Sequence, residues 1–110
     1  MPEDLSALYQ KTINQQRDYL ARLQEAFNQH CDEITTEAET KLKGLPAGDN
    51  EARKQVHEEQ KKKLDEALNH LRAEIDKSSR ETRKELEKIN CEREESRLQE
   101  LEQLMQQTGT

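Results

Sequence analysis

The sequence predicts an all-α fold: an elongated, coiled-coil-like antiparallel hairpin of two long helices. Residues 44–50 contain two of the three glycines and one of the two prolines, and they interrupt an otherwise continuous helical pattern. The residues on either side are rich in Glu, Lys, Gln, Leu, Ala and Arg, which are strong helix formers. We therefore expect a single domain over 1–110, with a helix at about 3–43, a turn at 44–50 and a longer helix at about 51–107.

The first helix is predicted from the spacing of its apolar residues and from its ends. Apolar residues recur in steps of three and four, which is typical of one helix face rather than a strand. Pro2 suits a first helical turn, and Glu3 and Asp4 complement the positive end of the helix dipole. Gly44 is predicted to end the helix in the left-handed conformation. The apolar ladder is Leu5, Leu8, Tyr9, Ile13, Tyr19, Leu20, Leu23, Ala26, Phe27, Cys31, Ile34, Ala38, Leu42 and Leu45.

The second helix is predicted to begin at Asp49 or Asn50, because either side chain can cap a helix N-terminus. It continues to about Gln107. Its apolar residues follow the same steps of three and four, which again indicates one helix face. They are Ala52, Val56, Leu64, Ala67, Leu68, Leu71, Ile75, Leu86, Ile89, Leu98, Leu101, Leu104 and Met105.

A turn centred near residue 47 also predicts which residues face each other. Facing residues then have numbers that add to about 94, which sets Gln16 opposite Ser78 and Ser79. Because 76–85 contains no apolar residue, we expect a polar layer between the helices there. It either sets the register, as a buried polar residue does in a coiled coil, or forms a hydrated waist.

The predicted helices differ in length, so the second one extends past the first. The N-terminal end of the first helix should lie opposite residue 90, so about 91–107 has no intrachain neighbour. This segment still carries apolar residues on one face, and an isolated apolar face gains little unless another helix covers it. The candidate interaction residues are therefore Leu98, Leu101, Leu104 and Met105. Two alternatives are a shifted register in which the first helix covers them, and simple fraying.

Composition limits the classes of partner. The chain has 110 residues, a net charge of −6, 30% apolar and 38% charged residues. Nucleic-acid binding depends on clustered Lys and Arg, so we expect no nucleic-acid partner. No apolar run is long enough for membrane insertion, and the first residues lack the pattern of a signal peptide; a cytoplasmic protein is expected. Leu, Ile, Val and Phe number only 19, so disorder of the free monomer is the alternative to an ordered hairpin.

Neither catalysis nor cofactor binding is expected. Two slender helices offer no concave pocket in which a general acid or base could shift its pKa. Glu-x-x-His and His-Glu-x-x-His motifs are absent, so no metal site is predicted, although His30, Cys31 and His70 could meet across a dimer. Cys31 and Cys91 are too far apart along the predicted hairpin for a disulfide, and we expect reduced thiols.

These patterns indicate a non-enzymatic protein–protein interaction module, such as an adaptor, spacer or assembly factor that works through helix faces. Small scaffolds with a thin core usually need oligomerisation, so a homodimer is expected. Its two hairpins form a four-helix bundle along their apolar faces, or pair through the overhanging C-terminal segments alone; another protein's helix is the alternative partner. The alternative function is a chaperone or stalk-like component of a bacterial protein-export apparatus. The expected shape is similar to the two-helix stalk proteins of type III export, but no motif accompanies that likeness.

Overall fold

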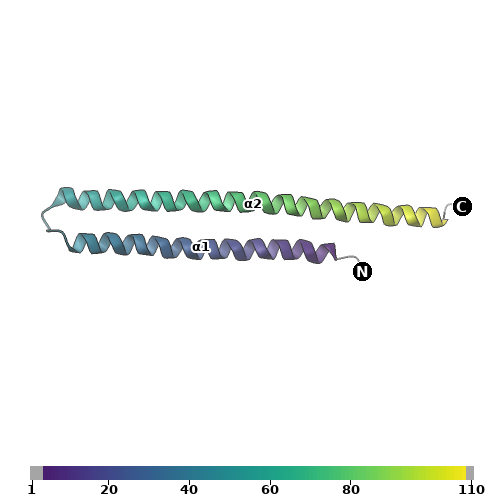
Figure 1. Ribbon diagram of the computed structural model, residues 1–110, viewed down its shortest axis with the longest axis horizontal. Coiled ribbons are helices and arrows are strands. Elements are labelled where there is room, and N and C mark those ends of the chain that lie inside the picture. Colours follow the sequence, from purple (N-terminus) through teal and green to yellow (C-terminus); the bar gives the residue numbers. More distant parts are fainter. Residues whose placement is uncertain (1–3, 109–110) are drawn as a thin grey trace. The chain divides into compact units, whose positions relative to one another are not determined.

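The computed structural model describes residues 4–108, which form two helices, α1 (Leu5–Lys43) and α2 (Asn50–Thr108), shown in Figure 1. The predicted all-α class is confirmed, and none of the described residues is in a strand. The chain divides into two compact units, each containing part of both helices. The turn unit is Tyr19–Asp76, and the terminal unit is Met1–Asp18 with Lys77–Thr110.

The turn unit is an antiparallel helical hairpin. Lys63 contacts Glu37 at 3.2 Å between Nζ and Oε1, and the Tyr19 hydroxyl donates to Glu74 Oε2 at 3.3 Å. The numbers of Tyr19 and Glu74 add to 93, close to the predicted 94, whereas the long Lys63 side chain reaches a residue further along α1 and gives a sum of 100. The register prediction is thus confirmed in this unit. Three apolar side chains are buried here, Ile34, Ala38 and Leu71.

Asp residues cap the N-terminus of each helix. Asp49 Oδ1 accepts a hydrogen bond from the Ala52 amide at 3.1 Å, so Asp49 is the cap of α2 and Asn50 is already helical. Asp4 Oδ1 accepts from the Ser6 amide at 3.0 Å and caps α1. Asp4 therefore precedes the helix, whereas the sequence had placed it within the first turn. Pro2 and Glu3 lie outside the described residues.

The prediction that Gly44 adopts a left-handed conformation is wrong, because none of the described glycines has a positive φ. Instead, the last turn of α1 is wound more tightly than a regular α-helix. The Gly44 amide donates to the carbonyls of Thr40 and Lys41, and the Leu45 amide donates to the Leu42 carbonyl at 3.2 Å. The Leu42 carbonyl also accepts from Arg53 Nη1 at 3.4 Å. Since these bonds satisfy the terminal carbonyls, no left-handed residue is required.

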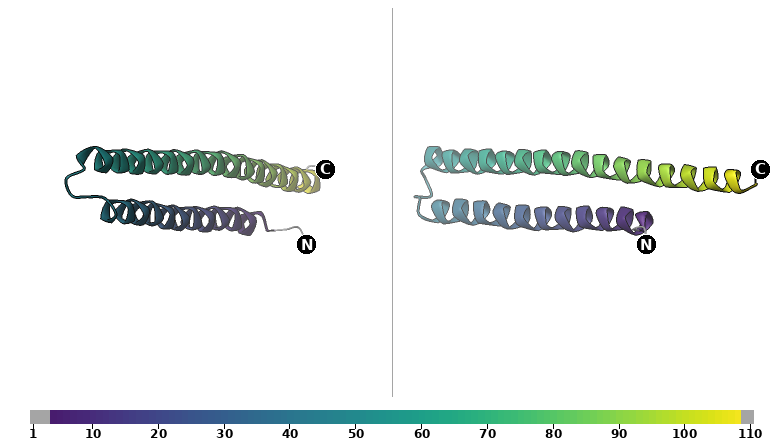
Figure 2. Two further views of the ribbon diagram at one scale, coloured as in Figure 1. Left: turned by 60° about the vertical axis from the view of Figure 1, so that its left-hand side comes forward. Right: turned by 45° about the vertical axis from the view of Figure 1, so that its right-hand side comes forward.

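The terminal unit pairs the first turns of α1 with the second half of α2, and Figures 1 and 2 show these segments side by side. Gln16 Nε2 donates to Ser79 Oγ at 3.5 Å, which confirms the predicted polar layer. Further along, the Arg93 guanidinium lies over the Tyr9 ring, 6.0 Å from its centroid. Ile89 lies between these two levels and is the most completely buried large side chain. The segments are antiparallel.

Candidate interaction surfaces

The predicted interaction residues are all exposed. Their exposed fractions are 60% for Leu98, 50% for Leu101, 57% for Leu104 and 70% for Met105. Every residue of 94–108 is exposed, although the segment is helical throughout. We call these four residues the stripe. An isolated helix keeps such side chains in water at a cost in free energy, and among the described residues of the terminal unit the stripe holds the exposed large apolar side chains.

The stripe is uncovered because α1 begins too late in the chain to reach it. Tyr9 is level with Arg93, and α1 begins one turn before Tyr9, at Leu5. Within the terminal unit, α2 residues well beyond Arg93 therefore have no α1 residue beside them. The alternative in which a shifted α1 covers the stripe is not what the structure has.

The stripe also points away from the face that α2 presents to α1. Helical residues are separated by about 100°. Leu98 lies nine residues after the buried Ile89, which places it about half a turn away around the helix axis, and Leu101 and Met105 lie about 120° and 160° from Ile89. Only Leu104 approaches the face of Ile89. Sliding α1 further along α2 would therefore leave most of the stripe uncovered.

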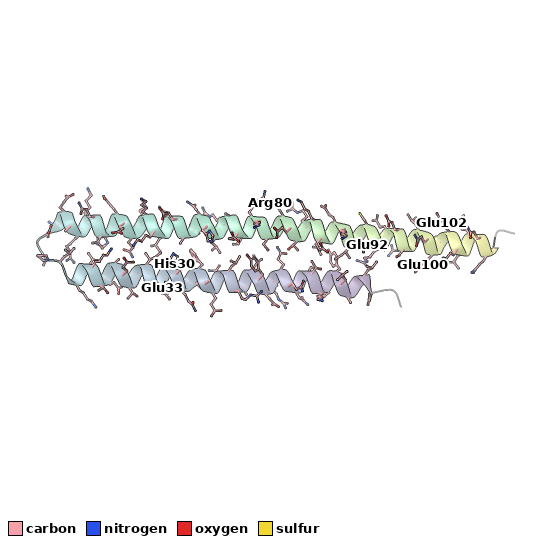
Figure 3. All side chains as sticks on the ribbon, viewed as in Figure 1. His30, Glu33, Arg80, Glu92, Glu100 and Glu102 are labelled. Carbon is pink, nitrogen blue, oxygen red and sulfur yellow. The ribbon has the colours of Figure 1, made fainter. Side chains whose placement is uncertain are left out.

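The segment that carries the stripe is acidic. Four glutamates, Glu94, Glu95, Glu100 and Glu102, accompany the single basic residue, Arg97. Glu100 and Glu102 project from different sides of α2 in Figure 3. The stripe is consequently an apolar strip with charged edges, the arrangement found where one helix packs against another.

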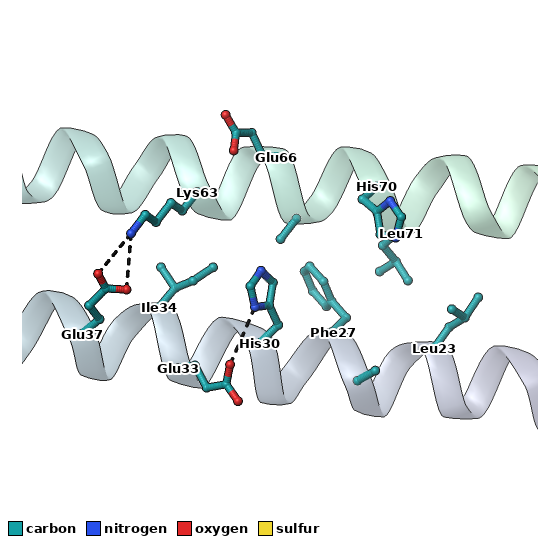
Figure 4. Close-up of a pocket in the computed structure, with 12 residues that line it drawn as sticks. Leu23, Phe27, His30, Glu33, Ile34, Glu37, Lys63, Glu66, His70 and Leu71 are labelled. Atoms are coloured by element: carbon teal, nitrogen blue, oxygen red, sulfur yellow. Dashed lines mark hydrogen bonds and ion pairs between the residues drawn. The ribbon is translucent and has the colours of Figure 1, made fainter.

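A second apolar surface lies in the turn unit. A groove of about 630 Å³ runs between α1 and α2. The apolar residues that line it, which we call its floor, include Leu23, Phe27 and Ile34 from α1 and Leu71 from α2, and Figure 4 shows these side chains in the space between the two helices. Polar side chains complete the lining, namely His30, Glu33, Glu37, Lys63, Glu66 and His70. The expectation that two slender helices would offer no concave pocket is therefore wrong. Ala26 and Ala67 line it, and two small residues within facing ladders were the available signal, because they leave space between larger neighbours.

Four charged residues form a closed ring of ion pairs across the hairpin of the turn unit. Lys41 lies 3.2 Å from Glu37 and 3.4 Å from Glu59, and Lys63 lies 3.2 Å from Glu37 and 3.4 Å from Glu59. The pKa of Glu37 is lowered, mainly by Lys63 and next by Lys41. The pKa of Glu59 is lowered, mainly by Lys41 and next by Lys63. Hydrogen bonding to Glu37 raises the pKa of Lys63. All four side chains are solvent-accessible, so the ring sets register more than it adds stability.

Histidine, cysteine and acidic side chains are the other candidates for chemistry. His30 Nδ1 lies 3.9 Å from Glu33 Oε2, its neighbour on the same helix. Within residues 4–108 no group of three or more His, Cys, Asp or Glu side chains is placed to hold a metal ion. Cys31 and Cys91 are free thiols, Cys31 half-buried and Cys91 exposed.

No protein-family model, curated protein or solved structure matches this chain. Neither α1 nor α2, over the part described, contains a stretch apolar enough to cross a bilayer.

Proposed function

We propose that this protein is a non-enzymatic interaction module, an adaptor, spacer or assembly factor that binds another helix through the stripe. The observation that carries the proposal is the exposure of Leu98, Leu101, Leu104 and Met105 on a segment that is fully helical. A helix-in-groove or helix-on-helix contact recognises apolar residues at this spacing.

The energetics favour a contact of modest strength. Burying one Leu or Met side chain contributes about 1.5–3 kcal/mol relative to leaving it exposed. Four such residues supply a gross gain of roughly 10 kcal/mol, while association costs about 4–15 kcal/mol in lost freedom. The stripe thus supports a reversible complex. Its helix is already formed, so little further ordering is needed when it binds.

Self-association is the favoured use of these surfaces. Among residues 4–108 only four apolar side chains are buried: Ile34, Ala38, Leu71 and Ile89. Small scaffolds with such thin cores gain stability by oligomerising. A homodimer in which two hairpins form a four-helix bundle would cover the apolar floor of the groove as well as the ladders beside it.

The test is a pull-down and mass measurement on the wild type and on Leu101→Asp. We expect the substitution to remove bound chains and lower the mass in solution, because it places a charge at the centre of the stripe. Ser96→Asp is the matched control, because Ser96 is exposed and lies about 140° from Leu101 around α2. Circular dichroism checks that both variants stay helical. An unchanged partner profile and mass for Leu101→Asp would refute the proposal.

The groove in the turn unit favours one second candidate, a chaperone or stalk-like component of a protein-export apparatus. A groove lined by both apolar and polar side chains suits a client's amphipathic helix. Phe27→Asp, which alters the floor, should then release a co-purified client, whereas Leu101→Asp should not. Leu101→Asp therefore separates the two functions, because only the module that binds through the stripe depends on Leu101.

A further inference from the structure

We propose that the stripe pairs with the stripe of a second copy of this chain, and that the two helices run parallel. This inference rests on the proposed function and specifies its partner and orientation. It is carried by the spacing of the apolar residues and by the charges at their edges.

The exposed residues of α2 follow a heptad pattern over 91–108. Cys91, Leu98 and Met105 are seven residues apart and occupy the a positions. Leu101 occupies the d position between Leu98 and Met105. Apolar residues at a and d form the seam of a two-stranded coiled coil. All of these side chains are exposed, so the seam is available to a second helix.

The pattern also limits the length of the pairing. One heptad earlier, the a and d positions hold Lys84 and Glu87. In a parallel pair these residues would meet their own copies, and like charges at a seam repel. The seam is therefore confined to about two and a half heptads, and we expect weak, concentration-dependent pairing.

Charge selects the parallel orientation. In a parallel coiled coil, a g residue lies beside the e residue five positions later in the partner helix. Here Arg97 is at g and Glu102 is at e. Each helix would therefore place Arg97 beside Glu102 of the second copy, and twofold symmetry would give two attractive pairs.

The antiparallel orientation has the opposite charge balance. Helices packed with Leu98 against Leu101 of the second copy would bring their e positions together. Glu95 would then lie beside Glu102 of the second copy, and symmetry would give two repulsive pairs. Arg97 would lie beside Leu104 instead of a carboxylate.

One residue opposes the parallel orientation. Glu94 occupies a d position and would face Glu94 of the second copy. This is one repulsion against two attractions, whereas the antiparallel pair has two repulsions and no attraction. Glu94→Leu should therefore tighten self-association, because it removes the repulsion and extends the apolar seam.

A charge exchange separates the two orientations by the sign of its effect. Glu102→Arg should raise the Kd of self-association about tenfold in the parallel pair, because Arg97 then meets a second cation. The same substitution would lower the Kd in the antiparallel pair, where the introduced guanidinium would meet Glu95. Adding Arg97→Glu should restore the wild-type Kd only in the parallel pair. Sedimentation equilibrium at low salt measures the wild type, both single variants and the double variant, and added salt should reduce the differences.

Cys91 provides an independent measure of orientation. In a Cys31→Ala background, copper phenanthroline should oxidise the parallel pair to a dimer linked through Cys91, which lies at the seam. The control chain carries Cys31→Ala, Cys91→Ala and Ser96→Cys, so its single cysteine lies on the side of α2 away from the seam. This chain should form much less disulfide-linked dimer. Chains whose only cysteine is Cys91 are then mixed with chains carrying Cys91→Ala and Thr108→Cys. A predominant mixed disulfide would indicate the antiparallel pair and overturn the inference.

The outcomes distinguish this inference from the proposed function. A wild-type chain that is monomeric at hundreds of micromolar overturns self-pairing. If Leu101→Asp still removes a bound protein from that monomer, the interaction function stands with a different partner. If Leu101→Asp changes neither mass nor bound proteins, both are refuted.

Discussion

At the scale of single residues, the buried side chains are few and far apart along the chain. Ile89 of the terminal unit is 1% exposed, while Ile75 of the turn unit is 37% exposed. A fully buried isoleucine contributes about 1.5–3 kcal/mol relative to an exposed one. Each buried position therefore carries a large share of the stability of its own unit, and backbone positions that constrain the turn matter correspondingly more.

Gly44 is one such backbone position, and Gly44→Ala is expected to stabilise the protein by about 0.5 kcal/mol. Its φ is not positive, and an added Cβ would meet only the carbonyls of Lys41 and Thr40, at 3.6 and 3.9 Å. Alanine then restricts the unfolded chain without straining the folded one. Urea denaturation measures the change.

Gly48→Ala is the matched control for that measurement. An added Cβ at Gly48 has no neighbour within 4 Å, and its φ is also not positive. It should stabilise by a similar amount. A loss of about 1 kcal/mol in Gly44→Ala would mean that Gly44 is left-handed in solution.

At the scale of helices, the start of α2 depends on one side chain. Asp49→Ala should destabilise the protein by about 1 kcal/mol, because it removes the acceptor of the Ala52 amide. Asn50→Ala should be neutral or slightly stabilising, because Asn50 is already inside the helix and alanine has the higher helix propensity. Thermal unfolding followed by circular dichroism compares the two. Equal losses would contradict the assignment of Asp49 as the cap.

The ion-pair ring predicts how stability depends on pH. The pKa values of Glu37 and Glu59 are lowered from their ordinary 4.5, so their stabilisation is present above pH 4.5 and is lost as pH falls through the lowered values. The pKa of Lys63 is raised from 10.5, so its stabilisation is present below pH 10.5 and is lost as pH rises through the raised value.

The denaturant concentration at the midpoint of unfolding should therefore change least with pH between about 4.5 and 10.5. Glu37→Gln should reduce the loss of stability at low pH and at high pH, because Glu37 contacts both lysines. Glu58→Gln is the control, because Glu58 lies outside the ring. An identical pH profile for Glu37→Gln and the wild type would show that the ring contributes nothing in solution.

The sequence could predict the helices because their signals are local. Helix propensity, the capping residues at 49–50 and the turn residues placed all four helix ends within about two residues, and the position of the turn then set the register and the polar layer. The conformation of Gly44 could not be predicted in this way, because it depends on a bond from Arg53 in the next helix. The ring has the same limitation, because spacing along one helix can indicate the Glu37–Lys41 and Glu59–Lys63 pairs but not the pairs between helices.

The stripe could be predicted because it needs only helix lengths and spacing, whereas the groove depends on how two ladders leave space between them. Ala26 and Ala67 are strong helix formers, and each fits an apolar ladder on its own. Only their common location, in the same stretch of the hairpin, produces the hollow.

At the scale of the whole molecule, stability and association should be coupled. The described residues bury four apolar side chains, yet leave four large ones of the stripe more exposed. Any second copy that binds the folded chain and not the unfolded one raises the apparent stability by mass action. The melting temperature of the wild type should therefore rise with protein concentration.

Leu98→Asp tests this coupling, because it places a charge in the seam without touching a buried residue. At high concentration its melting temperature should fall below that of the wild type, and at low concentration the two should converge, since the dissociated chains share the same core. Scanning calorimetry over a hundredfold concentration range measures both curves. A wild-type melting temperature independent of concentration would contradict self-association. A constant difference between the two proteins at every concentration would instead place Leu98 within the stability of the single chain.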